Sequence, residues 1–266
     1  MPPQYCQKFN VIGTHSLLAR ARARTNLRDL LRIRTRLRDL LRKPQRERLG
    51  KPSRFREGDW VRVLERERIR AILDGADRSR GLWFTPQQWE FCGGVFRVSK
   101  VMRRIIDDQG KYRPVHRTVL LNGVSCGGIP ETEGCGRHCP LMFRDEWLEP
   151  APDAATAQPR TPSPPSSPLY VVVRSAEEIR ASLDSQGRRD GLMVMNEMYG
   201  FAGRRFRVAY RLANVLEHNH FVPTRRPVYV LEGVACTGAA LGDNGPCDRR
   251  CPILWHGDWL RPENPA

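Results

Sequence analysis

Six of the eight cysteines in this chain occupy matched positions in two copies of one pattern, and thiolates at this spacing are suited to binding a metal. The matched cysteines are Cys126, Cys135 and Cys139 in the first copy and Cys236, Cys247 and Cys251 in the second. In each copy an apolar run and a cysteine precede a Gly-rich loop, a Cys-x-x-x-Cys-Pro turn and a closing Trp-Leu pair. Tetrahedral zinc takes four thiolate or imidazole ligands, and one such turn supplies two of them. The pattern therefore favours zinc in each copy, with iron or an iron-sulfur cluster as the less favoured alternative.

The fourth ligand is expected to differ between the two copies. The candidates in the first copy are Cys92, His138 and His116. The second copy has Ala202 in place of Cys92, and its candidates are His256, His218, His220 or a water molecule. A closed four-ligand site is structural, whereas an open position permits catalysis. Two other interpretations stay open: buried or disulfide-paired cysteines, and a catalytic or redox centre.

The cysteine pattern belongs to a longer internal repeat. The two copies keep a constant offset of 110 residues from Val63 and Val173 to Cys126 and Cys236. The cysteine loop is then two residues longer in the second copy, and a length change confined to one loop places that loop at the surface. Units of about 90 residues are long enough to be small domains. The sequence therefore predicts two homologous domains in tandem.

Short apolar runs, with one short helical segment in each copy, predict a mainly β fold. The expected architecture is two tandem, small SH3-like β-barrel domains plus an N-terminal basic amphipathic helix. We expect Trp147 and Trp259 to close the two cores. The predicted segments are a leader at 1–57, a first domain at 58–150, a linker at 151–168 and a second domain at 169–266. The linker is rich in Pro and Ser, so it should be extended and leave the domains free to move independently.

Residues 1–57 hold most of the positive charge. The formal net charge of the chain is +16, and this leader carries 16 Lys and Arg against four Asp and Glu, a balance of +12. Leucines at three- and four-residue spacings over residues 25–43 predict an amphipathic helix with an arginine face. The basic residues along this helix include Arg24, Arg28, Arg32, Arg34, Arg36, Arg38 and Arg42.

We expect these arginines to bind an acidic macromolecule, with nucleic acid as the first candidate and an anionic membrane surface as the second. The leucine stripe offers a face to a protein partner. No apolar run has the length of a membrane span or a signal-peptide core, so a cytoplasmic protein is expected. Clustered cysteines in that reducing compartment are typical of metal ligands. The sequence has no phosphate-binding loop and no Ser-His-Asp ordering, which argues against an enzyme.

At FCGGVFRV, TVLLNGVSC and CPLMFRDEWL the chain resembles a bacterial family of small, functionally uncharacterised cysteine-containing domains. The resemblance covers roughly residues 60–150 and 170–262, and it implies an SH3-like barrel without implying an activity. The pattern of this family matches the predicted cysteine ligands of both copies, which are Cys92, Cys126, Cys135, Cys139, Cys236, Cys247 and Cys251. Ala202 departs from the pattern, because it stands in the second copy where the family has a cysteine.

Together these observations predict a non-enzymatic tandem module of zinc-binding β-domains that binds an acidic partner through its basic helix. The alternative is a metalloenzyme or metal-handling accessory protein with the active metal site in one repeat.

Overall fold

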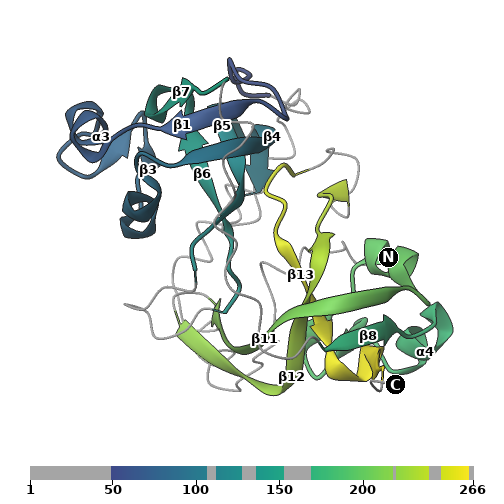
Figure 1. Ribbon diagram of the computed structural model, residues 1–266. Helices are drawn as coiled ribbons and strands as arrows, with labels where there is room; N and C mark the ends of the chain where they lie inside the picture. Colours follow the sequence, from purple (N-terminus) through teal and green to yellow (C-terminus); the bar gives the residue numbers. More distant parts are fainter. Residues whose placement is uncertain are drawn as a thin grey trace, which may run out of the picture.

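The computed structural model describes residues 49–106, 112–127, 136–152, 169–217, 220–239 and 247–263 (Figure 1). The predicted leader helix with its arginines from Arg24 to Arg42 lies outside the described residues, and so do Cys135 and residues 153–168 of the linker. Within the described part, no helix is long and apolar enough to cross a membrane.

Each repeat forms a five-stranded antiparallel sheet. The strands of the first sheet are β1 (Trp60–Val63), β4 (Val95–Ile106), β5 (Tyr112–Ser125), β6 (Pro140–Arg144) and β7 (Leu148–Pro150), in the order β6-β5-β4-β1-β7. The strands of the second are β8 (Tyr170–Val173), β11 (Arg205–Glu217), β12 (His220–Ala235), β13 (Pro252–His256) and β14 (Leu260–Pro262), in the order β13-β12-β11-β8-β14. The two orders are equivalent strand by strand, as expected for a duplicated domain.

Short elements connect these strands. The α-helices are α3 (Arg66–Ile72) and α4 (Ala176–Ala181), and the small hairpins pair β2 (Arg78–Ser79) with β3 (Leu82–Trp83) and β9 (Arg188–Arg189) with β10 (Leu192–Met193). The 3-10 helices are η1 (Pro86–Phe91), η3 (Asp145–Trp147), η5 (Asn196–Phe201) and η7 (Gly257–Trp259). The predicted mainly β fold with short helices is confirmed. Among the described strands, neither sheet closes into a barrel.

The start of α4 follows from its sequence. Ser175 Oγ accepts the N–H of Glu178 over 3.1 Å, and the Glu178 carboxylate accepts the N–H of Ser175 over 2.8 Å. This reciprocal pair satisfies two donors that the first turn of a helix leaves open. The Ser-x-x-Glu pattern of residues 175–178 therefore forms a capping box.

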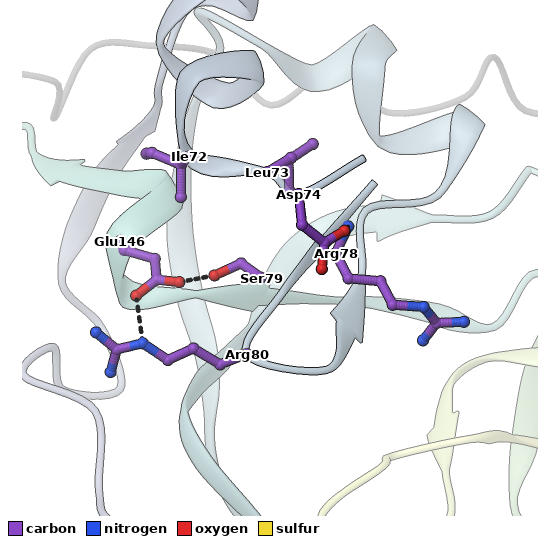
Figure 2. A pocket seen from close by; sticks show the side chains of 7 residues that line it. All are labelled: Ile72, Leu73, Asp74, Arg78, Ser79, Arg80 and Glu146. Atoms are coloured by element: carbon purple, nitrogen blue, oxygen red, sulfur yellow. Dashed lines mark hydrogen bonds and ion pairs between the residues drawn. The ribbon is translucent and has the colours of Figure 1, made fainter. Parts of the chain in front are cut away.

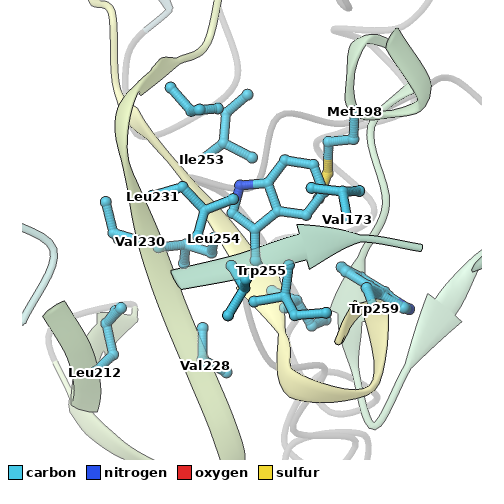
Figure 3. Packing of buried hydrophobic residues seen from close by; sticks show 14 of the residues in the cluster. Val173, Met198, Leu212, Val228, Val230, Leu231, Ile253, Leu254, Trp255 and Trp259 are labelled. Atoms are coloured by element: carbon cyan, nitrogen blue, oxygen red, sulfur yellow. The ribbon is translucent and has the colours of Figure 1, made fainter. Parts of the chain in front are cut away.

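Each domain has its own hydrophobic core. In β1, Val61 and Val63 have no exposed surface, whereas Arg62 between them points to solvent. Trp147 and Trp259 are completely buried in the first and second cores, as predicted. Figure 3 shows the second core, where the indoles of Trp255 and Trp259 lie among aliphatic side chains.

The long hairpin of β4 and β5 is buried on both faces over part of its length. Successive side chains of a strand point to opposite faces, and Val119 and Leu121 belong to the core of the first domain. Leu120 lies between them and points the other way, yet only 2% of it is exposed. Met102 on β4 is also fully buried outside that core. Other contacts must therefore cover the outer face of this hairpin.

The first domain begins before residue 58. Ser53 Oγ donates a hydrogen bond to the carboxylate of Asp145, and the Arg54 N–H donates to the same carboxylate over 2.9 Å. Phe55 is only 6% exposed and belongs to the core of this domain. Residues 49–57, predicted to belong to the leader, are thus part of the folded domain.

We predict that Ser182→Ala destabilises the second domain. Trp259 is fully buried, and its Nε1 donates to the half-buried Ser182 Oγ over 3.1 Å at the margin of the core. Without the hydroxyl, this buried N–H loses its acceptor, and the free energy of unfolding should fall by about 1–3 kcal/mol. Urea denaturation followed by tryptophan fluorescence measures the loss. Ser182→Thr keeps a hydroxyl and serves as the control, and equal stability of the Ala variant and the parent would contradict the prediction.

Candidate functional site

The cysteines that flank each loop lie next to each other on paired strands. The Cys126 N–H donates to the Cys139 carbonyl over 3.0 Å, and the Cys236 N–H donates to the Cys251 carbonyl over 2.8 Å. In each domain the first of these residues follows the longest strand and the second precedes the next strand, β6 or β13. The fold thus brings together two of the three matched cysteines in both domains.

The second cysteine loop depends on close packing at Gly238. The Gly238 N–H donates to the sulfur of Cys236 over 3.2 Å, and the Gly238 carbonyl accepts the Cys247 N–H over 3.3 Å. Gly238 has a φ of +79°, and a Cβ atom there would lie 2.1 Å from the Cys247 carbonyl oxygen. Glycine is therefore required at this position. An N–H aimed at sulfur favours the thiolate, which is the form that binds metal.

The three sulfurs of the second domain do not form a compact cluster. Among the described residues, the only group of three Cys, His, Asp or Glu ligand atoms within 4.8 Å of one another is Asp190, His256 and Asp258. Zinc–sulfur bonds of about 2.3 Å would place two sulfurs of a tetrahedral site about 3.8 Å apart. Cys236, Cys247 and Cys251 would have to draw closer to hold zinc together.

Two of the predicted fourth ligands, Cys92 and His256, lie outside the cysteine loops along the chain. Cys92 follows η1 and packs against the core of the first domain, as Cys126 does. Burial raises the pKa of its thiol, and its charged neighbours belong to the start of α3. His256 ends β13, and a strand rise of about 3.3 Å per residue puts it roughly 16 Å from Cys251. The extended strand therefore does not support His256 as a ligand of the second cysteine loop.

The other candidates have different positions. His116 accepts the Lys51 N–H at Nδ1 over 2.9 Å and lines a pocket of the first domain. His138 directly precedes Cys139, and burial lowers the pKa of its imidazole, so it is neutral at pH 7. His218 and the side chain of His220 lie outside the described residues. His138 is thus the described histidine that stays next to a cysteine loop.

Both cysteine loops contact the opposite domain. The Gly136 N–H of the first loop donates to the Asn214 carbonyl on β11 over 3.0 Å. The Asp248 N–H of the second loop donates to the Arg104 carbonyl on β4 over 3.1 Å. Gly136 and Asp248 are equivalent in the repeat, and so are Arg104 and Asn214. The two domains therefore exchange the same hydrogen bond in both directions, as in a two-fold symmetric interface.

The side chain of Asp248 adds two bonds that the equivalent residue of the first loop, Gly136, cannot make. Its carboxylate accepts the N–H groups of Arg103 and Arg104 over 2.8 and 3.0 Å. A β-bulge interrupts the pairing of β4 with β5 between Met102 and Arg104, and bulges leave ladder donors unpaired. Asp248 supplies the missing acceptor from the opposite domain.

Aromatic and charged contacts extend this interface. The ring of His138 lies 4.4 Å from the ring of Tyr210 on β11, and the Tyr210 hydroxyl donates to the Arg137 carbonyl over 3.0 Å. On the other side, burial raises the pKa of Glu57 in the first domain, but hydrogen bonds from Lys100 and Val101 and the positive charges of Lys100 and of Arg250 in the second loop lower it overall. The Pro- and Ser-rich linker predicts domains that move independently, whereas these contacts join the two domains through their cysteine loops.

Asp190, His256 and Asp258 form a hydrogen-bonded network. His256 Nδ1 accepts the Asp258 N–H over 3.1 Å, and its Nε2 lies 3.1 Å from the Asp190 carboxylate. Burial lowers the pKa of His256 against the opposing effect of the two carboxylates, so the ring is neutral at pH 7. Its proton is then on Nε2, because Nδ1 accepts a bond. Neither ring nitrogen has a lone pair left for a metal.

Two arginines further oppose a cation at this network. Arg189 Nη2 lies 2.7 Å from the Asp258 carboxylate, and Arg226 Nε lies 3.8 Å from that of Asp190. The Arg189 hydrogen bond lowers the pKa of Asp258. The carboxylates are thus neutralised by arginine, and the group does not fit a metal site.

The equivalent place in the first domain has a different chemistry. Arg80, Arg144 and Glu146 stand where the second domain has Asp190, His256 and Asp258. Figure 2 shows Glu146 between Ser79 and Arg80, with Arg80 Nε 3.4 Å from the carboxylate. The offset between the repeats pairs these positions, so their equivalence can be found from the sequence. That the three side chains of each set lie near one another is visible only in the structure.

We predict that Gly238→Ala costs more stability than Gly233→Ala. Both glycines have positive φ, at +79° and +71°, so both substitutions carry backbone strain of about 1–2 kcal/mol. A methyl group at Gly233 would have no other atom within 4 Å, whereas one at Gly238 would collide with the Cys247 backbone. Thermal unfolding should show the larger loss for Gly238→Ala. Equal losses for the two variants would mean that the loop accommodates the methyl group.

Comparisons with protein-family models, with curated proteins and with solved structures give no match for this chain. The resemblance to the bacterial cysteine-containing domains therefore stays a prediction.

Proposed function

We propose that this chain is a non-enzymatic module of two zinc-binding β-domains that binds an acidic partner, with nucleic acid as the class that fits its charge best. The zinc sites are structural, and they hold the cysteine loops in the shape that joins the two domains. The metalloenzyme alternative has no specific observation in its favour.

The reciprocal loop contacts carry this proposal. Gly136 and Asp248 each follow the second cysteine of their loop, and each donates its N–H to the opposite domain. Loops that use their backbone for domain contacts have a structural role that a catalytic metal with an open position does not require. Small domains with thin cores also commonly rely on a metal for stability.

The donor chemistry supports zinc. Cys236 and Cys251 are adjacent and buried, and Cys236 receives an N–H bond at sulfur. In the first domain, Cys126 and Cys139 are adjacent in the same way. We infer that Cys135 and Cys247 complete three thiolates in each loop, with His138 as the fourth ligand in the first. Zinc bound there would supply no chemistry beyond holding the loop.

The SH3-like architecture is part of the proposal. In each sheet the fifth strand pairs with the first, and a 3-10 helix, η3 or η7, precedes that last strand. This order of strands and the short helix are features expected of an SH3-like domain. Such small β-domains commonly present binding surfaces on their loops and strand edges.

We predict about two zinc ions per chain in protein purified without added metal, measured by elemental analysis. Cys251→Ser removes a ligand from the second loop, so the zinc content should fall to about one and the thermal midpoint should drop, because zinc binding contributes to folding. Cys92→Ser is the control, since Cys92 lies beside α3, and it should keep both ions. Unchanged zinc content in Cys251→Ser would contradict the proposal, and so would a parent chain without zinc.

We also predict binding to nucleic acid that weakens steeply with salt. The slope of log K against log salt reports the number of phosphates that basic side chains neutralise. Replacing the seven leader arginines, Arg24 to Arg42, by glutamine in the full chain should flatten this slope and lower the affinity. Fluorescence anisotropy with a labelled oligonucleotide measures both. Binding that ignores salt, or that survives the substitutions unchanged, would exclude the leader as the binding element.

A further inference from the structure

A pocket in the first domain concentrates positive charge. It has a volume of about 250 Å³ and is lined by Lys51, Arg80, His116, Arg117, Arg144 and Glu146. We call it the Arg144 pocket. Four of the six side chains are cationic at neutral pH and one is a carboxylate, which leaves an excess of positive charge. A concave surface of one sign of charge raises the local concentration of counter-ions, so this pocket is suited to an anion.

Arg144 is held by backbone oxygens and not by a carboxylate. Its guanidinium donates to the carbonyl of His116 and, over 2.9 Å, to the carbonyl of Arg80. Its Nε is buried and has no hydrogen-bond partner among the described residues. Burial lowers the pKa of Arg144, and the neighbouring Arg80 acts in the same direction against Glu146. An anion would offset this cost of burying a cation.

Two further cations of the pocket are available to a ligand. Neither Lys51 nor Arg117 forms an ion pair with any residue that the structure describes, and both are exposed. The single carboxylate, Glu146, is already engaged by Ser79 and Arg80 (Figure 2). His116 accepts the Lys51 N–H at Nδ1, so its ring proton is on Nε2 and can be donated.

The second domain lacks this excess of charge at the equivalent place. Asp190 replaces Arg80 and neutral His256 replaces Arg144. The two carboxylates there face Arg189 and Arg226, so the cationic and anionic charges balance. The Arg144 pocket is therefore a feature of one repeat, and the other repeat provides a natural control surface.

We propose that the Arg144 pocket binds a phosphate group. Phosphate fits better than a carboxylate because it offers more acceptor oxygens and a larger charge to several converging donors. The group comes either from a nucleic-acid backbone or from free or small-molecule phosphate. The inference deepens the proposed function, because it relies on an anionic partner and adds a defined contact for it in the first domain.

The test is calorimetric titration of the full chain with inorganic phosphate at constant ionic strength. Arg117→Gln should weaken binding by about tenfold, the value expected when a charge-assisted hydrogen bond is lost. Arg117 is exposed, so its substitution should leave the thermal midpoint unchanged. The matched control, Arg226→Gln, removes the same charge from the equivalent face of the second domain and should leave phosphate affinity unchanged.

The same two variants are then titrated with a labelled single-stranded oligonucleotide. Loss of affinity in Arg117→Gln alone identifies the nucleic-acid backbone as the source of the phosphate, and an unchanged affinity identifies free or small-molecule phosphate. Absence of phosphate binding by the parent overturns the proposal, and so do equal losses of phosphate affinity in the two variants. If oligonucleotide binding still depends on the leader arginines in either of those cases, the proposed function is retained and only the proposal of phosphate binding in the Arg144 pocket is rejected.

Discussion

The exchange of backbone hydrogen bonds between each cysteine loop and the opposite domain is the constraint on which the arrangement of this protein depends. Gly136 reaches Asn214 and Asp248 reaches Arg104, each over about 3 Å. The acceptors lie at β-bulges of the long strands, where ladder pairing is interrupted. Each domain thus offers an irregular strand and a loop that fits the irregular strand of the other. Burial of Met102 and Leu120 outside the core of their own domain agrees with such a second set of contacts.

The two repeats have kept this framework and diverged in the groups placed on it. Both keep the sheet order, the bulges and a tryptophan that closes the core. They differ where Arg144 is replaced by His256 and where Gly136 is replaced by Asp248. The first difference places the cationic Arg144 pocket in the first domain, and the second gives Asp248 an interface carboxylate where Gly136 has no side chain. Duplication therefore preserved the positions while the charges on them became specific to each domain.

The sequence predicts local features of this fold well and long-range ones poorly. The mainly β class, the buried Trp147 and Trp259 and the capping box at Ser175 follow from patterns that neighbouring residues determine. The pairing of each loop with the opposite domain has no such pattern, because it uses backbone N–H groups and carbonyls that every residue has. The fourth ligand could not be chosen from the sequence either. His256 is five residues from Cys251 along the chain, and only the extended shape of β13 shows that the two are far apart.

Zinc in the cysteine loops would couple the stability of each domain to its contact with the other. A loop without a metal loses conformational entropy when its backbone docks on a distant strand, and that cost weakens the contact. A metal that orders the loop before docking removes most of the cost, so binding of zinc and docking of the domains favour each other. Both loops supply contacts for this coupling, because the Asp248 carboxylate accepts two N–H groups of the first domain, while the Arg137 carbonyl and the His138 ring contact Tyr210 of the second. Each loop would therefore hold the opposite domain, and neither domain could lose its loop order without weakening the contact.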